Sequence, residues 1–201
     1  EVATGAARTV RRRTMNSFFS VGLDAYITSK FHDLREAHPD LCDNRTVNKT
    51  AYTLYGIGSF FTCHSLQGSL NIRLDGSCVP IPWAVEGISF LNIPSTADGT
   101  NPWDAPAWRA AHSDGAWGEQ SVSDGYLEVV GLRGAIHLAL LQAGVDGGVR
   151  LGQAAHVDIT VTPGRAVSAQ CDGEPIDMDG VTAFRIEPAN PVWLFHAPPA
   201  Y

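Results

Sequence analysis

Leu70-Asn71-Ile72-Arg73-Leu74-Asp75-Gly76 is the stretch that decides the fold class of this chain. Apolar and polar side chains alternate along it with a period of two, which is typical of a strand with one buried face. An Asp-Gly pair beside such a run is a strong short-range signal for a hairpin. We therefore expect the chain to turn at Asp75-Gly76 and to return as a second strand over residues 78–81.

Strand patterns recur along most of the chain. The continuous apolar run at residues 87–93 indicates a strand that is buried on both faces. The helices that we expect do not alternate strictly with the strands, which favours a mainly β (α+β), β-sandwich-like domain over a doubly wound parallel sheet. Further strands are expected at residues 18–22, 126–131, 157–161, 166–171, 181–186 and 192–195.

The first helix is expected to follow the strand that ends at Gly22. Asp24 is placed to cap it, because an aspartate side chain can accept the free backbone N–H groups of the first turn. Ile27, Phe31 and Leu34 then share one face of a helix that runs to about His38.

Two more helices and one long loop complete the predicted pattern. A weaker helix is expected around residues 47–54, and a short buried helix at residues 134–143. Residues 96–123 are rich in Gly, Pro, Asp and Trp and are expected to form a loop. Its tryptophans indicate either a flap that contacts a membrane or a packed aromatic surface, and the second interpretation is slightly favoured.

Composition limits the class of protein. The 201 residues, 44% of them hydrophobic, are enough for one sizeable core. A net charge of −7 argues against a nucleic-acid partner, which requires a clustered basic surface. The exception is a run of arginines at positions 8 and 11–13, which indicates a solvated tail or a contact with anionic lipid or a preceding domain. We expect residues 1–14 to be a disordered tail or linker and residues 15–201 to form one domain.

The four cysteines form no Cys-x-x-Cys pair and have no metal-like spacing with the seven histidines. Free thiols in a reducing, cytoplasmic compartment fit this pattern best. No apolar run approaches the length of a membrane span, so any membrane contact is expected to be peripheral.

Acidic glycine turns are the candidate functional features. Asp172-Gly173-Glu174 places two carboxylates on a turn that could hold a metal ion or a reacting hydroxyl, although a hairpin tip needs no function. Asp124-Gly125 has the same two interpretations, since an aspartate at a turn can bind a hard cation together with a backbone carbonyl. His137 is interpreted as a satisfied core residue. The chain contains neither a P-loop nor a Gly-x-Ser-x-Gly motif.

Several short stretches carry more information in their order than singly. They are Phe19-Ser20-Val21-Gly22-Leu23-Asp24-Ala25, Phe31-His32-Asp33-Leu34-Arg35-Glu36, Asn48-Lys49, Leu91-Asn92-Ile93-Pro94-Ser95, Asp124-Gly125-Tyr126-Leu127-Glu128-Val129-Val130-Gly131, His137-Leu138-Ala139 and Asp172-Gly173-Glu174-Pro175. Together, from about Asn16 to Glu187, they resemble the accessory domain of eukaryotic diacylglycerol kinases.

This resemblance implies one half of a lipid kinase. Such a kinase transfers the γ-phosphoryl group of ATP to diacylglycerol at a membrane surface and produces phosphatidic acid, a lipid of signalling. The nucleotide-binding half carries a Gly-Gly-Asp-Gly-Thr loop that this chain lacks. The resemblance therefore implies an upstream ATP-binding domain as partner, peripheral attachment to a membrane, and little activity of the chain alone.

The resemblance also assigns residues. Glu174 is implied as the catalytic base or magnesium-linked acid, with Asp172 supporting the turn, because phosphoryl transfer requires a positioned carboxylate and Mg²⁺. Asp124, with the backbone carbonyl of Leu127, resembles a structural Mg²⁺ site in bacterial relatives of the fold.

Residues that contact the nucleotide-binding half are implied at one edge of the domain, namely Asn16, Gly22 and Asp24. Two other interpretations stay open. One is a close relative that phosphorylates sphingosine or ceramide. The other is a non-catalytic β-sandwich module that binds a lipid or a protein.

Overall fold

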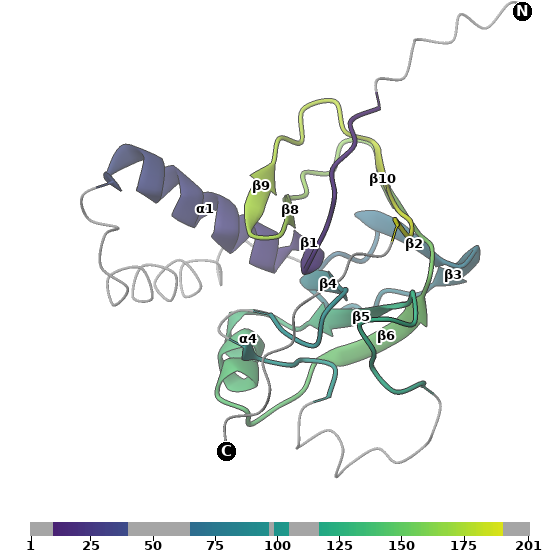
Figure 1. Cartoon of the computed structure of the whole chain (residues 1–201). Coiled ribbons are helices and arrows are strands. Elements are labelled where there is room, and N and C mark those ends of the chain that lie inside the picture. Colours follow the sequence, from purple (N-terminus) through teal and green to yellow (C-terminus); the bar gives the residue numbers. More distant parts are fainter. Residues whose placement is uncertain (1–9, 40–64, 97–98, 105–116, 191–201) are drawn as a thin grey trace, which may run out of the picture.

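The computed structural model describes residues 10–39, 65–96, 99–104 and 117–190. These residues form two antiparallel sheets and two helices, as Figure 1 shows. The six-stranded sheet has the order β6-β5-β4-β1-β8-β9, and the four-stranded sheet has the order β10-β7-β2-β3. The elements are β1 (Phe18–Gly22), α1 (Leu23–Ala37), β2 (Leu70–Leu74), β3 (Ser77–Val79), β4 (Gly87–Leu91), β5 (Leu127–Leu132), α4 (Ala135–Gln142), β6 (Val149–Ala154), β7 (Val157–Val161), β8 (Ala169–Cys171), β9 (Glu174–Ile176) and β10 (Ala183–Ile186).

The main core lies between the two sheets. Leu70, Ile72 and Leu74 of β2 are buried while the polar residues between them are exposed, so the predicted period of two is confirmed. From the larger sheet, Phe19 of β1 packs its ring against Phe184 of β10, with ring centroids 5.0 Å apart. The predicted mainly β, sandwich-like fold is therefore confirmed.

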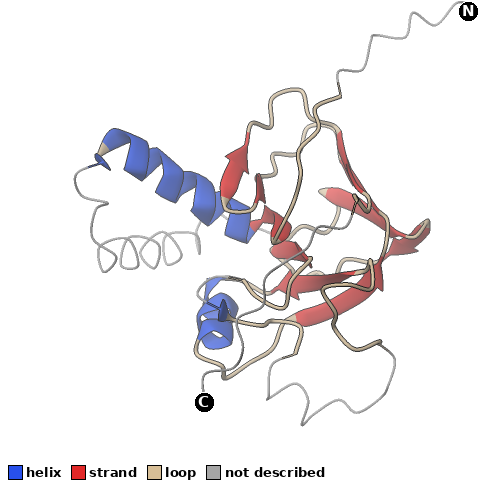
Figure 2. Cartoon of the chain, in the orientation of Figure 1, coloured by secondary structure: helices blue, strands red, loops and turns tan. Residues whose placement is uncertain are grey.

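The larger sheet is covered on its other face as well. Every residue of β4 and β5 is buried, as expected for strands with neighbours on both faces. Helix α1 packs against β1, β4, β8 and β9, and α4 packs against β5. Figure 2 shows both helices on the same side of the strands, away from the β2–β3 hairpin.

Helix α1 starts differently from the sequence prediction. Gly22 precedes it with φ 88°, and a Cβ atom there would collide with the carbonyl oxygen of Glu86, so glycine is required at this junction. No side chain caps the helix, and Asp24 lies inside its first turn. The prediction that Asp24 is the cap was therefore wrong, because the strand continues to Gly22 and the helix begins immediately after it. Of the predicted apolar face, Ile27 is buried, whereas Phe31 and Leu34 are only partly buried.

Three other sequence predictions differ from the structure or fall outside its described residues. The helix α4 was expected to be buried, but Ile136 and Leu140 are exposed and only His137 and Leu141 are buried. Strand β6 was missed, because its buried residues are Gly152 and Ala154, which are too small to give a clear apolar alternation. The helix expected around residues 47–54 and the strand expected at 192–195 lie outside the described residues.

Candidate functional site

The Asp172-Gly173 turn joins β8 to β9 as a two-residue hairpin. Cys171 pairs with Glu174 across it, and both turn residues have positive φ, 52° for Asp172 and 86° for Gly173. This left-handed conformation matches the right-handed twist of the flanking strands, which is why Asp-Gly is favoured there. The predicted hairpin is confirmed, and its geometry fixes the direction in which Glu174 leaves the turn.

The carboxylate of Asp172 holds the segment that leads into β1. Its Oδ2 accepts the backbone N–H of Asn16 at 2.7 Å, and its Oδ1 accepts those of Ser17 at 2.7 Å and Phe18 at 3.0 Å. The side-chain amide of Asn16 donates to Oδ2 as well, at 3.3 Å. Hydrogen bonds to an ionised acceptor are stronger than neutral ones, so this contact joins the hairpin firmly to residues 16–18. Asp172 thus supports the turn.

A second, buried network lies under the same hairpin. Gln170 accepts the backbone N–H of Gly173 through Oε1 at 2.7 Å. Its Nε2 donates to Ser20 Oγ at 2.7 Å and to Asp24 Oδ2 at 3.1 Å. Ser20 Oγ also donates to Asp24 Oδ2 at 2.8 Å. Asp24 therefore faces the interior between β1, β8 and the start of α1.

Glu174 is the carboxylate of this hairpin that faces solvent, with its side chain 63% exposed. Helix α1 lies beside β9 (Figure 1), and His32 of that helix places Nδ1 3.9 Å from Glu174 Oε2. The other ring nitrogen, Nε2, lies 3.1 Å from Glu36 Oε1. Because most of its side chain is open to solvent, the carboxylate of Glu174 is accessible to a ligand.

The structure brings some of the predicted site residues together and separates others. Asn16 contacts Asp172 directly, and Asp24 is linked to the turn through Gln170. Gly22 lies at the other end of β1, where its N–H donates to the carbonyl oxygen of Ser168 at 2.9 Å. Asp124 and Leu127 lie elsewhere, because β4 and β1 separate β5 from β8 in the sheet. Asp124 is exposed, and its Oδ1 accepts the N–H of Tyr126 at 2.9 Å. Among the described residues, no group of three or more His, Cys, Asp or Glu side chains forms a metal cluster.

Glu128 is a buried carboxylate that the sequence analysis did not single out. Its oxygens accept the amides of Gln120 at 3.1 Å and Gln153 at 3.2 Å. Burial raises the pKa of Glu128, the nearby charge of Asp124 raises it further, and the two amide hydrogen bonds oppose this shift. A charge inside the buried run Leu127–Leu132 was the signal that could have revealed it.

The network around Glu128 continues into the tryptophan-containing loop. Gln120 accepts a hydrogen bond from Asn101 at 2.8 Å, and Arg150 donates from Nε to the carbonyl oxygen of Trp103 at 2.8 Å. The Arg150 guanidinium also stacks 4.4 Å from the centre of the Trp103 ring, which is 2% exposed. The packed aromatic interpretation holds for Trp103, whereas Trp108 lies outside the described residues.

The two-sheet fold and its acidic hairpin define a β-rich, sandwich-like domain, and comparison with known proteins identifies its family. The family model for the diacylglycerol kinase accessory domain matches residues 14–175, a segment that contains every predicted site residue. This chain belongs to that family.

Relatives of the chain include several diacylglycerol kinases. The chain is 32% identical to diacylglycerol kinase theta of Rattus norvegicus and 33% identical to diacylglycerol kinase delta of Mus musculus and eta of Drosophila melanogaster. Each match covers 80% of this chain, but only 16%, 13% and 8% of the respective relatives. The chain thus corresponds to a small part of each of these proteins.

His137 has the structural role that its sequence context indicated. It is buried, its Nδ1 accepts the backbone N–H of Arg133 at 2.9 Å, and its Nε2 lies 2.9 Å from the carbonyl oxygen of Gly147. Both ring nitrogens are therefore engaged in joining α4 to the chain on either side of it. In the described residues, no helix is long and apolar enough to cross a membrane.

Proposed function

We propose that this chain is the accessory half of an ATP-dependent diacylglycerol kinase and that an upstream nucleotide-binding domain completes its active site. The kinase would phosphorylate diacylglycerol to phosphatidic acid at a membrane surface, to which it would attach peripherally. Membership of the accessory-domain family supports this proposal. The observation that carries the site is the exposed Glu174 carboxylate on a turn that two hydrogen-bond networks hold in place.

Glu174 would act as the general base. Its carboxylate would accept the hydroxyl proton of diacylglycerol while the hydroxyl oxygen bonds to the γ-phosphorus, and the bond from phosphorus to the bridging oxygen would break to release ADP. A positioned base accelerates such a step by about 100-fold to 10,000-fold. Mg²⁺ bound with ATP would neutralise the phosphate charge, and this chemistry would be supplied mainly through the nucleotide-binding half.

The residues around the hairpin would support this step. Asp172 would keep Glu174 in place through the backbone of residues 16–18, which is consistent with its three backbone hydrogen bonds. Asn16, Gly22 and Asp24 would form the edge on which the nucleotide-binding half docks. Of these three, Asn16 is exposed and able to make such a contact directly. Gly22 and Asp24 would shape the edge from beneath.

A structural Mg²⁺ site at Asp124 is a separate part of the proposal. Mg²⁺ takes oxygen ligands, keeps several waters and needs only one or two carboxylates. Asp124 fits such a hydrated ion, because it is exposed and its Oδ2 has no hydrogen bond among the described residues. The backbone carbonyl of Leu127 would complete the protein ligands.

Replacement of Glu174 by Gln in the full-length kinase tests the catalytic role. We expect kcat for phosphatidic acid formation from diacylglycerol vesicles and labelled ATP to fall by about 100-fold or more. Glu36→Gln is the matched control, because Glu36 is another exposed glutamate beside His32, and its kcat should change by less than about twofold. Undiminished turnover of a folded Glu174→Gln enzyme would contradict the assignment.

The alternative substrates are tested by replacing diacylglycerol with sphingosine or ceramide in the same vesicles and measuring phosphorylation of each lipid.

The metal site is tested by thermal unfolding of the same enzyme. Mg²⁺ should raise the unfolding temperature of the unaltered protein, and Asp124→Asn should abolish that increase, because a bound ion stabilises the state that binds it. An equal Mg²⁺ effect in both proteins would contradict the site.

A further inference from the structure

Gln170 has a buried side-chain amide, and the hydrogen bonds that it makes fix the orientation of that amide. It lies opposite Ser20 in the pairing of β8 with β1, and no part of it is exposed to solvent. Its Oε1 accepts a backbone N–H, and its Nε2 donates to a hydroxyl and a carboxylate. Reversing the amide would place donor against donor at Gly173 and acceptor against acceptor at Asp24, so one orientation is fixed.

This amide connects three elements around Glu174. The bond to the N–H of Gly173 fixes the residue directly before Glu174. The bonds to Ser20 and Asp24 tie that turn to β1 and to the first turn of α1. Since Asp24 belongs to α1, the amide sets the position of the turn relative to that helix. The same helix carries His32, whose Nδ1 lies 3.9 Å from Glu174 Oε2.

Asp75-Gly76, the other Asp-Gly hairpin among the described residues, has no such connection there. Arg73 stands two residues before Asp75, as Gln170 stands two residues before Asp172, but Arg73 is exposed. In the part of the chain that the structure describes, no side chain accepts the N–H of Gly76. The buried amide is therefore not a requirement of the turn type, and its presence under one hairpin calls for a separate explanation.

We propose that Gln170 is a positioning residue for phosphoryl transfer, which places the Glu174 carboxylate through the N–H of Gly173 without contacting the substrate. This inference rests on the proposed function of Glu174. A displacement of about 1 Å in a reacting group can reduce a rate by about 100-fold. Loss of the amide should therefore lower the rate of the chemical step while the binding of both substrates is retained.

Gln170→Met in the full-length kinase removes the amide and keeps the length of the side chain. With phosphatidylcholine vesicles that contain diacylglycerol, we expect kcat to fall by about 10-fold to 100-fold and both KM values to change by less than about twofold. Arg73→Met, at the matching position of the other hairpin, should leave kcat unchanged.

The decisive comparison is the double variant Gln170→Met with Glu174→Gln. If Gln170 acts only through Glu174, the double variant should be no slower than Glu174→Gln alone. A purely structural role would instead give multiplied losses and would overturn the inference, as would an unchanged kcat in Gln170→Met. Ser20→Ala, which removes one bond of the same network, takes the place of Gln170→Met in this cycle if the methionine variant does not fold.

The two proposals fail in different ways. Unchanged turnover in Glu174→Gln would overturn both the proposed base and its positioning residue. A large loss in Glu174→Gln together with multiplied losses in the double variant would leave the base in place and reject only the role of Gln170.

Discussion

The two Asp-Gly hairpins in the described part of the chain have the same local structure and different surroundings. Asp75-Gly76 joins β2 to β3, and Asp172-Gly173 joins β8 to β9, each as a two-residue turn with both φ angles positive. Residues Ser77 and Glu174 follow the turns at matching positions. The turn chemistry therefore comes from the same dipeptide in both cases and does not distinguish a functional hairpin from a structural one.

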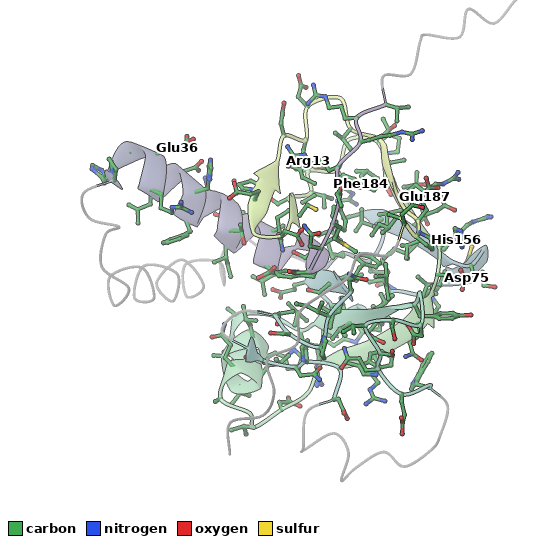
Figure 3. All side chains as sticks on the ribbon, viewed as in Figure 1. Arg13, Glu36, Asp75, His156, Phe184 and Glu187 are labelled. Atoms are coloured by element: carbon green, nitrogen blue, oxygen red, sulfur yellow. The ribbon has the colours of Figure 1, made fainter. Side chains whose placement is uncertain are left out.

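Their surroundings differ in exposure and in partners. Asp75 accepts the backbone N–H groups of Ala155 at 3.3 Å and His156 at 2.8 Å. Figure 3 shows Asp75 and His156 together on the side of the molecule opposite Glu36 at the far end of α1. Asp172 lies against the segment before β1 instead, with a buried amide beneath its turn. The difference teaches that the neighbours of a turn, and not its own sequence, make it a candidate site.

The largest difference in stability between the two hairpins is expected when the turn aspartates are replaced, by Asp172→Asn in one and Asp75→Asn in the other. Asparagine tolerates the left-handed conformation, so the turn survives and only the charge and one acceptor oxygen are lost. Asp172→Asn should lower the free energy of unfolding by about 2 kcal/mol and Asp75→Asn by about 1 kcal/mol or less, because Asp172 is less exposed and accepts more bonds. Urea unfolding of this chain measures both values, and the reverse order would contradict this account.

A smaller and equal effect is expected from Gly173→Ala and Gly76→Ala. A Cβ at either position would meet no atom within 4 Å, so the cost is conformational and arises from the positive φ alone. Each variant should lose about 1 kcal/mol of unfolding free energy, with the two losses alike. Clearly unequal losses in the same urea experiment would mean that the turns themselves differ.

The smallest expected difference is in the chemical reactivity of the two thiols on these hairpins, Cys171 and Cys78. Burial raises the pKa of Cys171, and the neighbouring Asp172 carboxylate raises it further, while Arg13 opposes the shift. A raised pKa leaves less thiolate at a given pH, so iodoacetamide at pH 8 should label the exposed Cys78 about 10-fold faster. Asp172→Asn should bring the two rates closer. Peptide mass spectrometry measures each cysteine separately, and faster labelling of Cys171 would contradict the prediction.

Much of the fold could be predicted because it depends on local pattern. The alternation at residues 70–74 and the two Asp-Gly turns depend only on adjacent residues, and both predictions were confirmed. Strand β6 could not be found this way, because its buried residues, Gly152 and Ala154, are small and give little apolar signal. Its polar side chains Arg150 and Gln153 instead bind Trp103 and Glu128. The exposure of apolar residues on α4 could not be predicted either, since composition alone does not tell which apolar helix lies at the surface.

The candidate site was predicted in its residues but not in its arrangement. The sequence identified Asp24, Asp172 and Glu174, yet it gave Asp24 the role of a helix cap. In the structure, Asp24 accepts a hydrogen bond from Gln170, a residue 146 positions away. The roles of Glu174 as base and of Asp124 as a metal ligand stay predictions.

The sequence by itself determined the β pattern, the hairpin turns and the family, because each depends on neighbouring residues or on short stretches in a fixed order. Only the tertiary structure decided which hairpin lies against α1, which carboxylates are enclosed and which one faces solvent. The contacts responsible join residues such as Ser17 and Asp172, which are 155 positions apart. Such contacts form only when the sheet closes, and no spacing along the chain specifies them.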